Sequence, residues 1–290
     1  MSKFMELLRG LRPKKGLFVG RRVFRAYESK EYKDVLSMLS SLNGRLFKDL
    51  TENDMSILHR AAHDGNLECV SVLQDLPYFS QVVNDNSNEQ KFAPIHWAAV
   101  KSDYTLLRFL HKRGADLMQP KKDGMTVLHI AASQNDVHVL DYALQNLDGS
   151  SVDMKNNEGW TSAHLASFLG NMDSLNLLIE YGASLYETHK DNYDPVQEAV
   201  RTDNSAVLQC VYKAYSQRKR DLGKAETFGL LHLAAGIEGS DCLEYLLREG
   251  EFINQICNVH DRATPLHFSM LTQNLPNANY LLKHGANPNA

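Results

Sequence analysis

The residues of this chain whose types could do chemistry are mainly histidines and cysteines. His59 and His63 stand four residues apart, a spacing that would place two metal ligands on one face of a helix. Two histidines are an incomplete ligand set for a zinc ion, so we expect His59 to belong to the recurring series described below and His63 to occupy an ordinary exposed position. The four cysteines form no C-x-x-C pair, which argues against a zinc ribbon and a disulfide framework. We therefore predict no metal site.

Catalytic signatures are absent from the sequence. None of the motifs G-x-G-x-x-G, H-E-x-x-H and G-x-S-x-G occurs, and there is no complete phosphate-binding loop. Residues 10–16 have part of the spacing of such a loop, but Leu17 stands where the lysine is required. We predict no catalytic residue, no cofactor and no enzymatic activity.

A regular period accounts for six of the twelve histidines. The spacing between successive members of the series is 33–37 residues, and Gln197 fills one position. Each member follows a short apolar pair and precedes a segment of small residues, and a second apolar block comes next. Such self-similarity predicts stacked helix pairs that bury their apolar faces against one another. The series is His59, His96, His129, His164, Gln197, His232 and His267.

Each unit contains the signals of a helix start. Thr264 is a good N-cap, Pro265 suits the first helical position, and His267 at the third can reach back to the cap. Asp194 and Gln197 repeat this arrangement in the fifth unit. Its second helix lacks the usual glycine ending, so we predict a longer helix or an insertion near residues 208–223. Four of the other second helices are expected to end at a glycine: Gly114, Gly182, Gly250 and Gly285. The leading apolar residues expected in the core are Leu58, Ile95, Leu128, Leu231 and Leu266.

The units resemble the ankyrin repeat family, whose signature is T-P-L-H-x-A-A, over about residues 51 to 290. The resemblance implies an all-α fold, a solenoid of antiparallel helix pairs with β-turn or hairpin tips. The expected repeats are 51–87, 88–120, 121–154, 155–188, 189–223, 224–257 and 258–290. Residues 20–50 read as a degenerate capping repeat, in which Val23, Phe24, Val35, Leu36 and Leu39 are apolar.

Residues 1–19 form a separate basic segment. Residues 1–25 contain eight Lys or Arg and one acid, whereas the rest of the chain has a net charge of −11. Three interpretations stay open for residues 1–16: contact with an anionic membrane surface, docking on a partner or on the repeats, and a mitochondrial presequence. We favour docking. The acidic remainder is a poor nucleic-acid binder, and we predict no nucleic-acid partner.

The composition also bears on location and on the chain's far end. There is no run of about 18 apolar residues for a membrane span, and the scattered cysteines suit a reducing compartment, so we predict a cytoplasmic protein. The last repeat ends on an apolar helix without a polar cap. We expect either that more protein follows or that this end associates, and we favour a piece of a longer protein. The sequence does not predict an oligomeric state.

The repeat positions that the resemblance places on the concave face suggest an interaction surface. The residue before the Thr-Pro step is large and apolar or aromatic in six of the seven units. Such residues are typical binding anchors, although turn-tip aromatics can also stabilise the stack, Trp160 in particular. The predicted protein-binding residues are Phe92, Met125, Trp160, Phe168, Leu169, Tyr193, Arg201 and Phe228.

The resemblance implies protein–protein recognition. We predict a scaffold or adaptor that binds a partner protein or peptide on the concave face of the repeats. Two alternatives remain: the cytosolic ankyrin region of a larger enzyme or ion channel, and a membrane-peripheral adaptor that uses the basic N-terminus.

Overall fold

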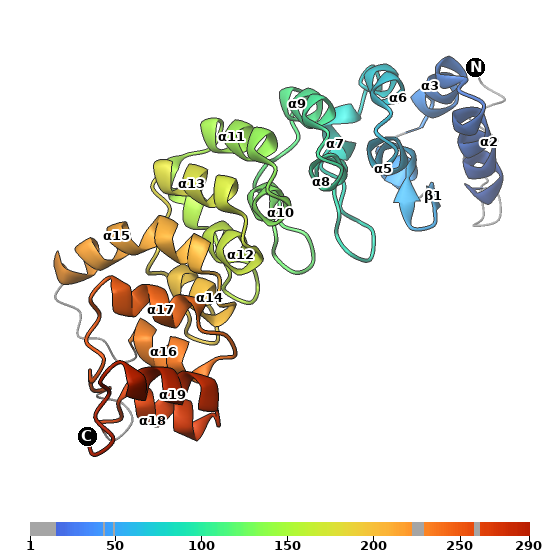
Figure 1. Ribbon diagram of the computed structural model, residues 1–290. Helices are drawn as coiled ribbons and strands as arrows, with labels where there is room; N and C mark the ends of the chain where they lie inside the picture. The colour runs from blue at the N-terminus through green and yellow to red at the C-terminus, as the bar shows by residue number, and fades with distance from the viewer. Residues whose placement is uncertain (1–15, 43, 49, 222–228, 258–261) are drawn as a thin grey trace. The chain divides into compact units, whose positions relative to one another are not determined.

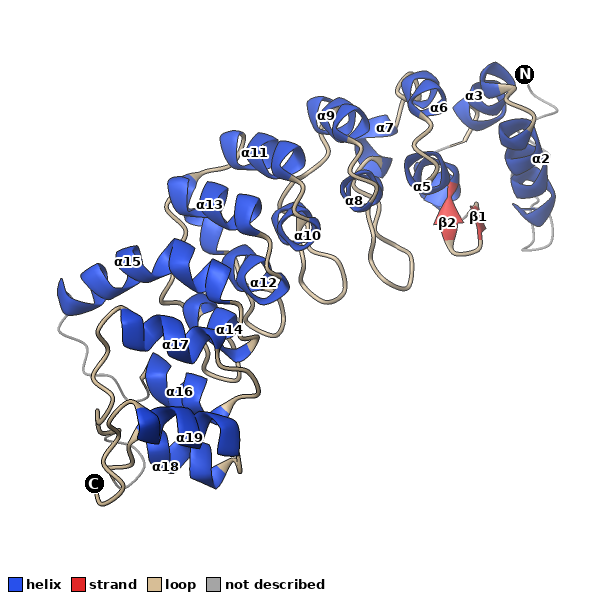
Figure 2. Cartoon of the chain, in the orientation of Figure 1, coloured by secondary structure: helices blue, strands red, loops and turns tan. Residues whose placement is uncertain are grey.

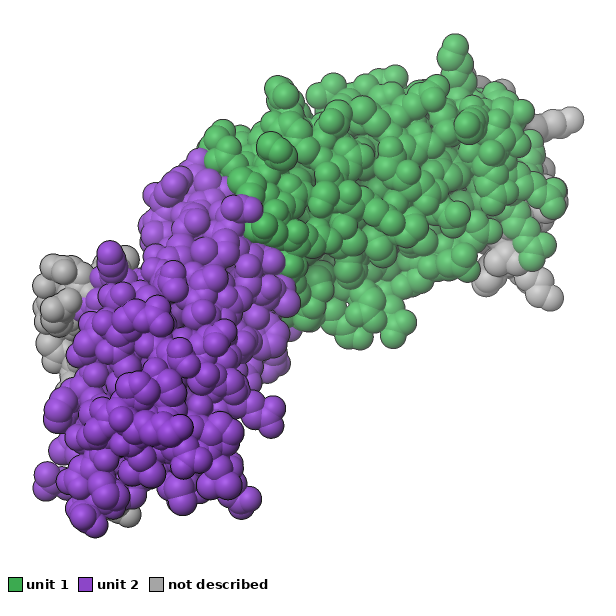
Figure 3. Space-filling model, in the orientation of Figure 1, with its two compact units in different colours: residues 1–148 green, residues 149–290 purple. Residues whose placement is uncertain are grey.

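The computed structural model describes residues 16–42, 44–48, 50–221, 229–257 and 262–290 (Figure 1). Their regular secondary structure consists almost entirely of helices, most of them short, which turns and loops connect (Figure 2). In the part described, the strands are β1 (Thr51–Glu52) and β2 (Met55–Ser56), an antiparallel pair in which Thr51 faces Ser56. The chain divides into two compact units, residues 1–148 and 149–290, which we describe separately (Figure 3).

Unit 1 is built from antiparallel helix pairs. Helices α5, α8 and α10 pack side by side as the first helices of successive pairs, and α9 and α11 pack as second helices. The short helices α4 and α7 pack on each other beside this stack. The helices are α2 (Gly16–Glu28), α3 (Tyr32–Ser40), α4 (Gly44–Lys48), α5 (Ile57–His63), α6 (Leu67–Leu73), α7 (Phe79–Val82), α8 (Pro94–Val100), α9 (Tyr104–Lys112), α10 (Val127–Gln134) and α11 (Val137–Gln145).

Unit 2 repeats this arrangement. Helices α12, α14, α16 and α18 pack in succession as first helices, and α13, α15 and α17 pack as second helices. The elements are the 3-10 helix η1 (Gly149–Asp153), then α12 (Ser162–Leu169), α13 (Met172–Glu180), α14 (Pro195–Arg201), α15 (Ser205–Asp221), α16 (Leu230–Gly236), α17 (Asp241–Arg248), α18 (Pro265–Leu271) and α19 (Leu275–Lys283). At 17 residues, α15 is the long second helix that the sequence predicts.

The helix starts confirm the predicted capping. At α18, the N-cap Thr264 donates its backbone N–H to Nδ1 of His267, 3.1 Å away. At α14, Gln197 replaces the histidine: Asp194 N–H donates to Gln197 Oε1 at 3.0 Å, and Gln197 N–H donates to Asp194 Oδ1 at 2.8 Å. Both devices satisfy backbone groups that a helix terminus leaves unpaired.

The predicted helix ends and core residues are also confirmed. The four predicted glycines have φ between 85° and 96°, the left-handed conformation in which glycine ends a helix without strain. The five leading Leu and Ile residues are all buried. Repeated burial of one apolar residue per first helix explains why the helix pairs stack.

The N-terminal pair α2–α3 packs on the repeats, with α2 against α5 and α3 against α6. Val23, Phe24, Val35 and Leu39 are buried. Helix α2 begins at Gly16, so it overlaps the end of the basic segment 1–19. Tyr78 donates its hydroxyl to the Leu39 carbonyl oxygen at 2.7 Å and thereby ties the pair to the first repeat.

Candidate functional site

The structure describes seven of the eight predicted binding residues. Phe228 lies outside the described residues. Phe92 and Met125 belong to unit 1, and the other five belong to unit 2. The site is therefore built from unit 2, where α12 and α14 pack together and bring its five residues into one neighbourhood.

In unit 1, the predicted residues take part in local packing. Phe92 stacks on Trp97, with ring centroids 4.6 Å apart, and the Lys121 ammonium lies 5.3 Å from the Phe92 ring. Met125 is half-buried, and its backbone N–H donates to Asp123 Oδ1 at 3.0 Å. Both residues help to hold the turns that precede α8 and α10.

Trp160 connects the fourth and fifth repeats. It precedes the N-cap of α12 and is half-buried. Its ring stacks flat on His189, with centroids 4.7 Å apart and planes 5° apart, and it meets the Phe168 ring edge-on at 5.5 Å. One side of the indole is thus used for packing between repeats, and Phe168 covers another side.

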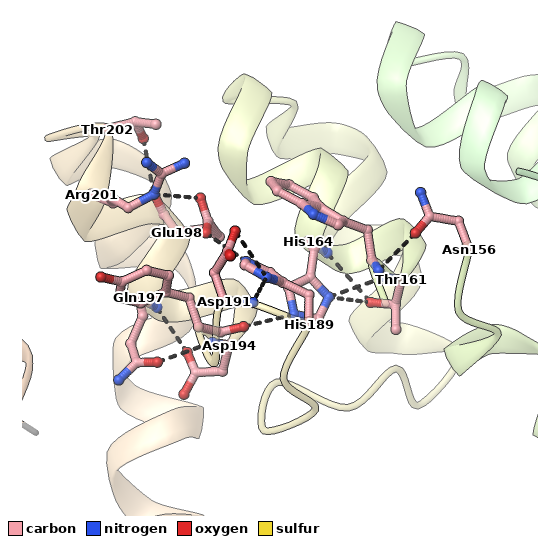
Figure 4. A network of polar contacts seen from close by, with 12 residues as sticks. Asn156, Thr161, His164, His189, Asp191, Asp194, Gln197, Glu198, Arg201 and Thr202 are labelled. Carbon is pink, nitrogen blue, oxygen red and sulfur yellow. Dashed lines mark hydrogen bonds and ion pairs between the residues drawn. The ribbon is translucent and has the colours of Figure 1, made fainter. Parts of the chain in front are cut away.

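His189 is buried beneath Trp160 and is held in one tautomer. Its Nδ1 accepts the backbone N–H of Asp191 at 3.1 Å, so the ring proton sits on Nε2. Nε2–H donates to Glu198 Oε1 at 2.8 Å. Figure 4 shows His189 and Glu198 facing each other across the space between the turn and α14.

Glu198 is a fully buried acid on α14. Its second oxygen, Oε2, accepts from Arg201 Nε at 3.1 Å. Burying a carboxylate without partners is costly, and here both oxygens have one. In the other repeats, the corresponding position carries Arg60, Trp97, Ile130, Leu165, Leu233 and Phe268.

Arg201 connects the buried His189–Glu198 pair to the protein surface. Its guanidinium carbon lies 5.5 Å from the centre of the Phe168 ring and 5.8 Å from that of Tyr193. Both distances are within the range of a cation–π contact. The Arg201 side chain is 40% exposed, although its Nε is fixed by a buried group.

Exposed apolar residues lie beside the arginine. Phe168 is 37% exposed, and Leu169, which follows it at the end of α12, is 50% exposed. We call Phe168, Leu169, Tyr193 and Arg201, with Trp160 at their base, the aromatic–arginine surface. It combines partly exposed apolar groups with an oriented cation.

The titratable groups beneath this surface are held in hydrogen bonds. His189 and Glu198 are buried and bonded to each other. His164 is buried and donates to the Tyr193 carbonyl oxygen at 3.1 Å, and burial lowers its pKa to about 4. Within the described parts of the chain, no group of three or more His, Cys, Asp or Glu side chains is arranged to hold a metal ion. His63, half of the metal pair considered from the sequence, bonds Asp64 at 2.8 Å.

Sequence reasoning missed His189 and Glu198. A usable signal was the glutamate in the fifth repeat, at a position where all but one of the other units carry a large apolar residue. His189 had no comparable signal, because it lies in a turn outside the histidine series.

Comparison with known proteins agrees with the repeat architecture. A family model described as ankyrin repeats (three copies) matches residues 24–121, 96–189 and 196–290. Among the described helices, none is long and apolar enough to cross a membrane.

Several curated proteins share part of this chain. Diacylglycerol kinase zeta of Rattus norvegicus is 32% identical over 37% of the chain and 12% of its own length. The nuclear factor NF-kappa-B p105 subunit of Gallus gallus is 26% identical over 69% of the chain and 20% of its own length. The putative palmitoyltransferase ZDHHC13 of Danio rerio is 27% identical over 61% of the chain and 27% of its own length. The chain thus spans less than a third of each of these relatives.

Proposed function

The chain belongs to the ankyrin repeat family, and from this premise we propose that it is a scaffold or adaptor that binds a partner protein or peptide on its aromatic–arginine surface. Ankyrin repeats are generally protein–protein interaction modules, and the fold is generally non-catalytic. We accordingly propose a binding role without enzymatic activity for these 290 residues.

The observation that carries this proposal is the exposure of Phe168, Leu169 and Arg201 above a buried polar network. Aromatic and arginine side chains supply most of the energy in many interfaces. Their supports, Trp160 and Glu198, are fixed by packing and hydrogen bonds, so little ordering entropy is lost on this side when a partner docks.

The test is affinity purification with mass spectrometry from native lysate. We expect the double variant Phe168→Ala/Leu169→Ala to lose a partner that the wild type retains. Trp160 is left intact because its stacking on His189 makes it structural as well. The matched control is Phe252→Ala, which removes an apolar side chain that is 66% exposed elsewhere in unit 2. A partner set unchanged by the double variant would contradict the proposal.

A second candidate is favoured by the relatives' lengths. Diacylglycerol kinase zeta and the palmitoyltransferase share only 12% and 27% of their own length with this chain. We propose as the alternative that these repeats are the recognition region of a longer enzyme or channel. An antibody raised against residues 51–290 would distinguish the two in an immunoblot, because a band near 32.7 kDa argues against the alternative and a much larger band supports it.

We also propose a cytoplasmic location, and we keep contact of residues 1–16 with an anionic membrane surface as the alternative to their docking. Fluorescent tagging tests the location. Co-sedimentation with anionic liposomes, with and without residues 1–16, tests the contact, and equal pelleting of the two proteins would reject it.

A further inference from the structure

We infer that Arg201 determines specificity in the aromatic–arginine surface and selects a partner segment that carries an Asp or Glu side chain beside an apolar residue. The inference rests on the proposed function, because it names the chemistry of the partner at the same surface.

The first argument is the orientation of the guanidinium. Arg201 Nε is bonded to Glu198, and Glu198 is held on its other oxygen by the buried His189. The inner edge of the guanidinium is thereby fixed against the protein, as Figure 4 shows. In the described structure, no residue accepts a hydrogen bond from either Nη group. The outer edge keeps the pair of parallel N–H donors that a carboxylate can accept.

The second argument is preorganisation. The Phe168 and Tyr193 rings lie within 6 Å of the guanidinium carbon. An arginine confined by two rings and a buried carboxylate has already lost most of its rotamer freedom, so a carboxylate that pairs with it meets a smaller entropy cost. A surface lysine at this position would lack both the planar donor pair and this confinement.

The third argument is the charge around the arginine. Lys190 and Glu158 form an exposed ion pair at 3.2 Å, so their opposite charges offset each other. Asp191, which is 81% exposed, is the like charge that an acidic partner would meet. Glu198 offsets the formal charge of Arg201, so selectivity would come from directional hydrogen bonds rather than from a broad positive field.

The fourth argument is the apolar neighbour. Phe168, whose ring faces Arg201, and Leu169, which follows it in the chain, are both exposed and offer contact to an aliphatic or aromatic residue of the partner. An acidic residue and an apolar residue close together in one segment would use both parts of the surface. Burying the apolar contact would also strengthen the carboxylate–guanidinium hydrogen bonds, because water is excluded from them.

The experiment selects random 12-residue peptides displayed on phage against the 290-residue chain. We expect the selected peptides to share an Asp or Glu at a fixed distance from an apolar residue. Peptide affinities are then measured by fluorescence anisotropy, with each peptide made in its acidic form and with Asn or Gln replacing the acid. Arg201→Gln should weaken binding of the acidic peptide about tenfold or more and leave the amide peptide unchanged.

Two further variants guard against misfolding and indirect effects. Arg201→Lys keeps a charge for Glu198 but lacks the planar donor pair, so we expect it to lose several-fold in affinity for the acidic peptide while it melts at nearly the wild-type temperature. Asp191→Asn removes the like charge and should tighten binding of the acidic peptide.

The outcomes separate this inference from the proposed function. The selected peptides could lack an acid at a fixed position and still bind the Phe168→Ala/Leu169→Ala variant more weakly than the wild type. This result would overturn the role of Arg201 and support the binding surface. Peptides that bind equally to that double variant and to the wild type would overturn both. Equal losses for acidic and amide peptides in Arg201→Gln would also overturn the specificity role.

Discussion

At the scale of single residues, the buried histidines His96 and His164 must stay uncharged to keep the hydrogen bonds of both ring nitrogens. His96 Nδ1 accepts the Ala93 N–H at 2.9 Å, so its Nε2 carries the proton that is donated to the Gln119 carbonyl oxygen at 2.8 Å. His164 is held in the same way by Thr161 N–H and the Tyr193 carbonyl. A second ring proton on Nδ1 would meet the backbone N–H that this atom accepts, and burial lowers the pKa of both histidines to about 4.

This arrangement predicts acid sensitivity. An unfolded histidine titrates near 6.5, so the unfolded chain binds more protons than the folded chain between about pH 4 and about pH 6.5. The stabilisation that each neutral histidine contributes to the free energy of unfolding is therefore fully present above about pH 6.5. It falls as the pH is lowered toward 4, by at most about 3 kcal/mol for each histidine. Urea unfolding across this range measures the slope.

The control for this titration is His164→Gln, a substitution that copies Gln197, which makes the same cap in the fifth repeat. The variant should cost about 1 kcal/mol at pH 7.5 for its lost bond to Tyr193. It should also show a flatter dependence on pH. Parallel slopes for the variant and the wild type would show that His164 is not a source of the acid sensitivity.

Glu198 gives a second prediction for a single residue. Glu198→Gln keeps the shape but only one acceptor oxygen, so one of the two donors, His189 Nε2–H or Arg201 Nε–H, meets the new amide NH2 group and loses its hydrogen bond. We expect a loss of about 1–2 kcal/mol in the free energy of unfolding. Glu158→Gln, which breaks the exposed pair with Lys190, should change stability by less than about 0.5 kcal/mol. Similar losses in the two variants would mean that burial adds nothing to the Glu198 network.

At the scale of elements, one helix start is completed by a residue of the preceding repeat. The N-cap of α17, Ser240, makes no side-chain capping bond. Asp203 instead accepts the backbone N–H groups of Asp241 at 3.2 Å and Cys242 at 2.8 Å. Gly239 leaves room for this carboxylate and has φ of 101°.

Gly239→Ala should therefore be more harmful than an ordinary glycine substitution. The new methyl group would overlap the Asp203 carboxylate, and we expect a loss of about 2–3 kcal/mol from the lost cap and the strained φ. Gly250→Ala is the matched control, because its φ of 92° is similar and no atom lies within 4 Å of the added carbon. It should cost only about 1 kcal/mol. Equal thermal melting shifts for the two variants would contradict a capping role for Asp203.

The elements also show which features the sequence could predict. Helix starts, glycine ends and leading Leu and Ile residues depend on local chemistry that recurs in most of the repeats, so a single sequence predicts them. The His189–Glu198 bond joins a turn to a helix nine residues later. Nothing in a repeat pattern indicates that such a pair meets, because a glutamate among apolar counterparts can equally point to solvent. The same reasoning explains why the sequence singled out Arg201 without the buried acid that orients it.

At the scale of the whole molecule, stability in stacked repeats comes from each pair's contacts with its neighbours. In unit 1, α8 contacts both α5 and α10. In unit 2, α18 packs on α16, and the outer side of α18 exposes Leu271, which is 73% accessible. His267 makes its capping bond with Thr264. In the described structure, no carbonyl oxygen accepts a hydrogen bond from His267 Nε2, whereas the Nε2 groups of His96 and His164 each donate to one.

Hydrogen exchange should reveal this difference within the intact chain. In the part of the chain that the structure describes, α18 packs on α16 and α19, and His267 lacks a bond to a following turn, so we expect α18 and α19 to open locally at a lower free energy than the pairs within each stack. We expect their backbone amides to exchange about tenfold faster than those of α16 and α17. The pair α8–α9, flanked on both sides in unit 1, supplies the reference for full protection. Equal protection of α16–α17 and α18–α19 would contradict the nearest-neighbour account, because it would mean that unit 2 opens only as one cooperative body.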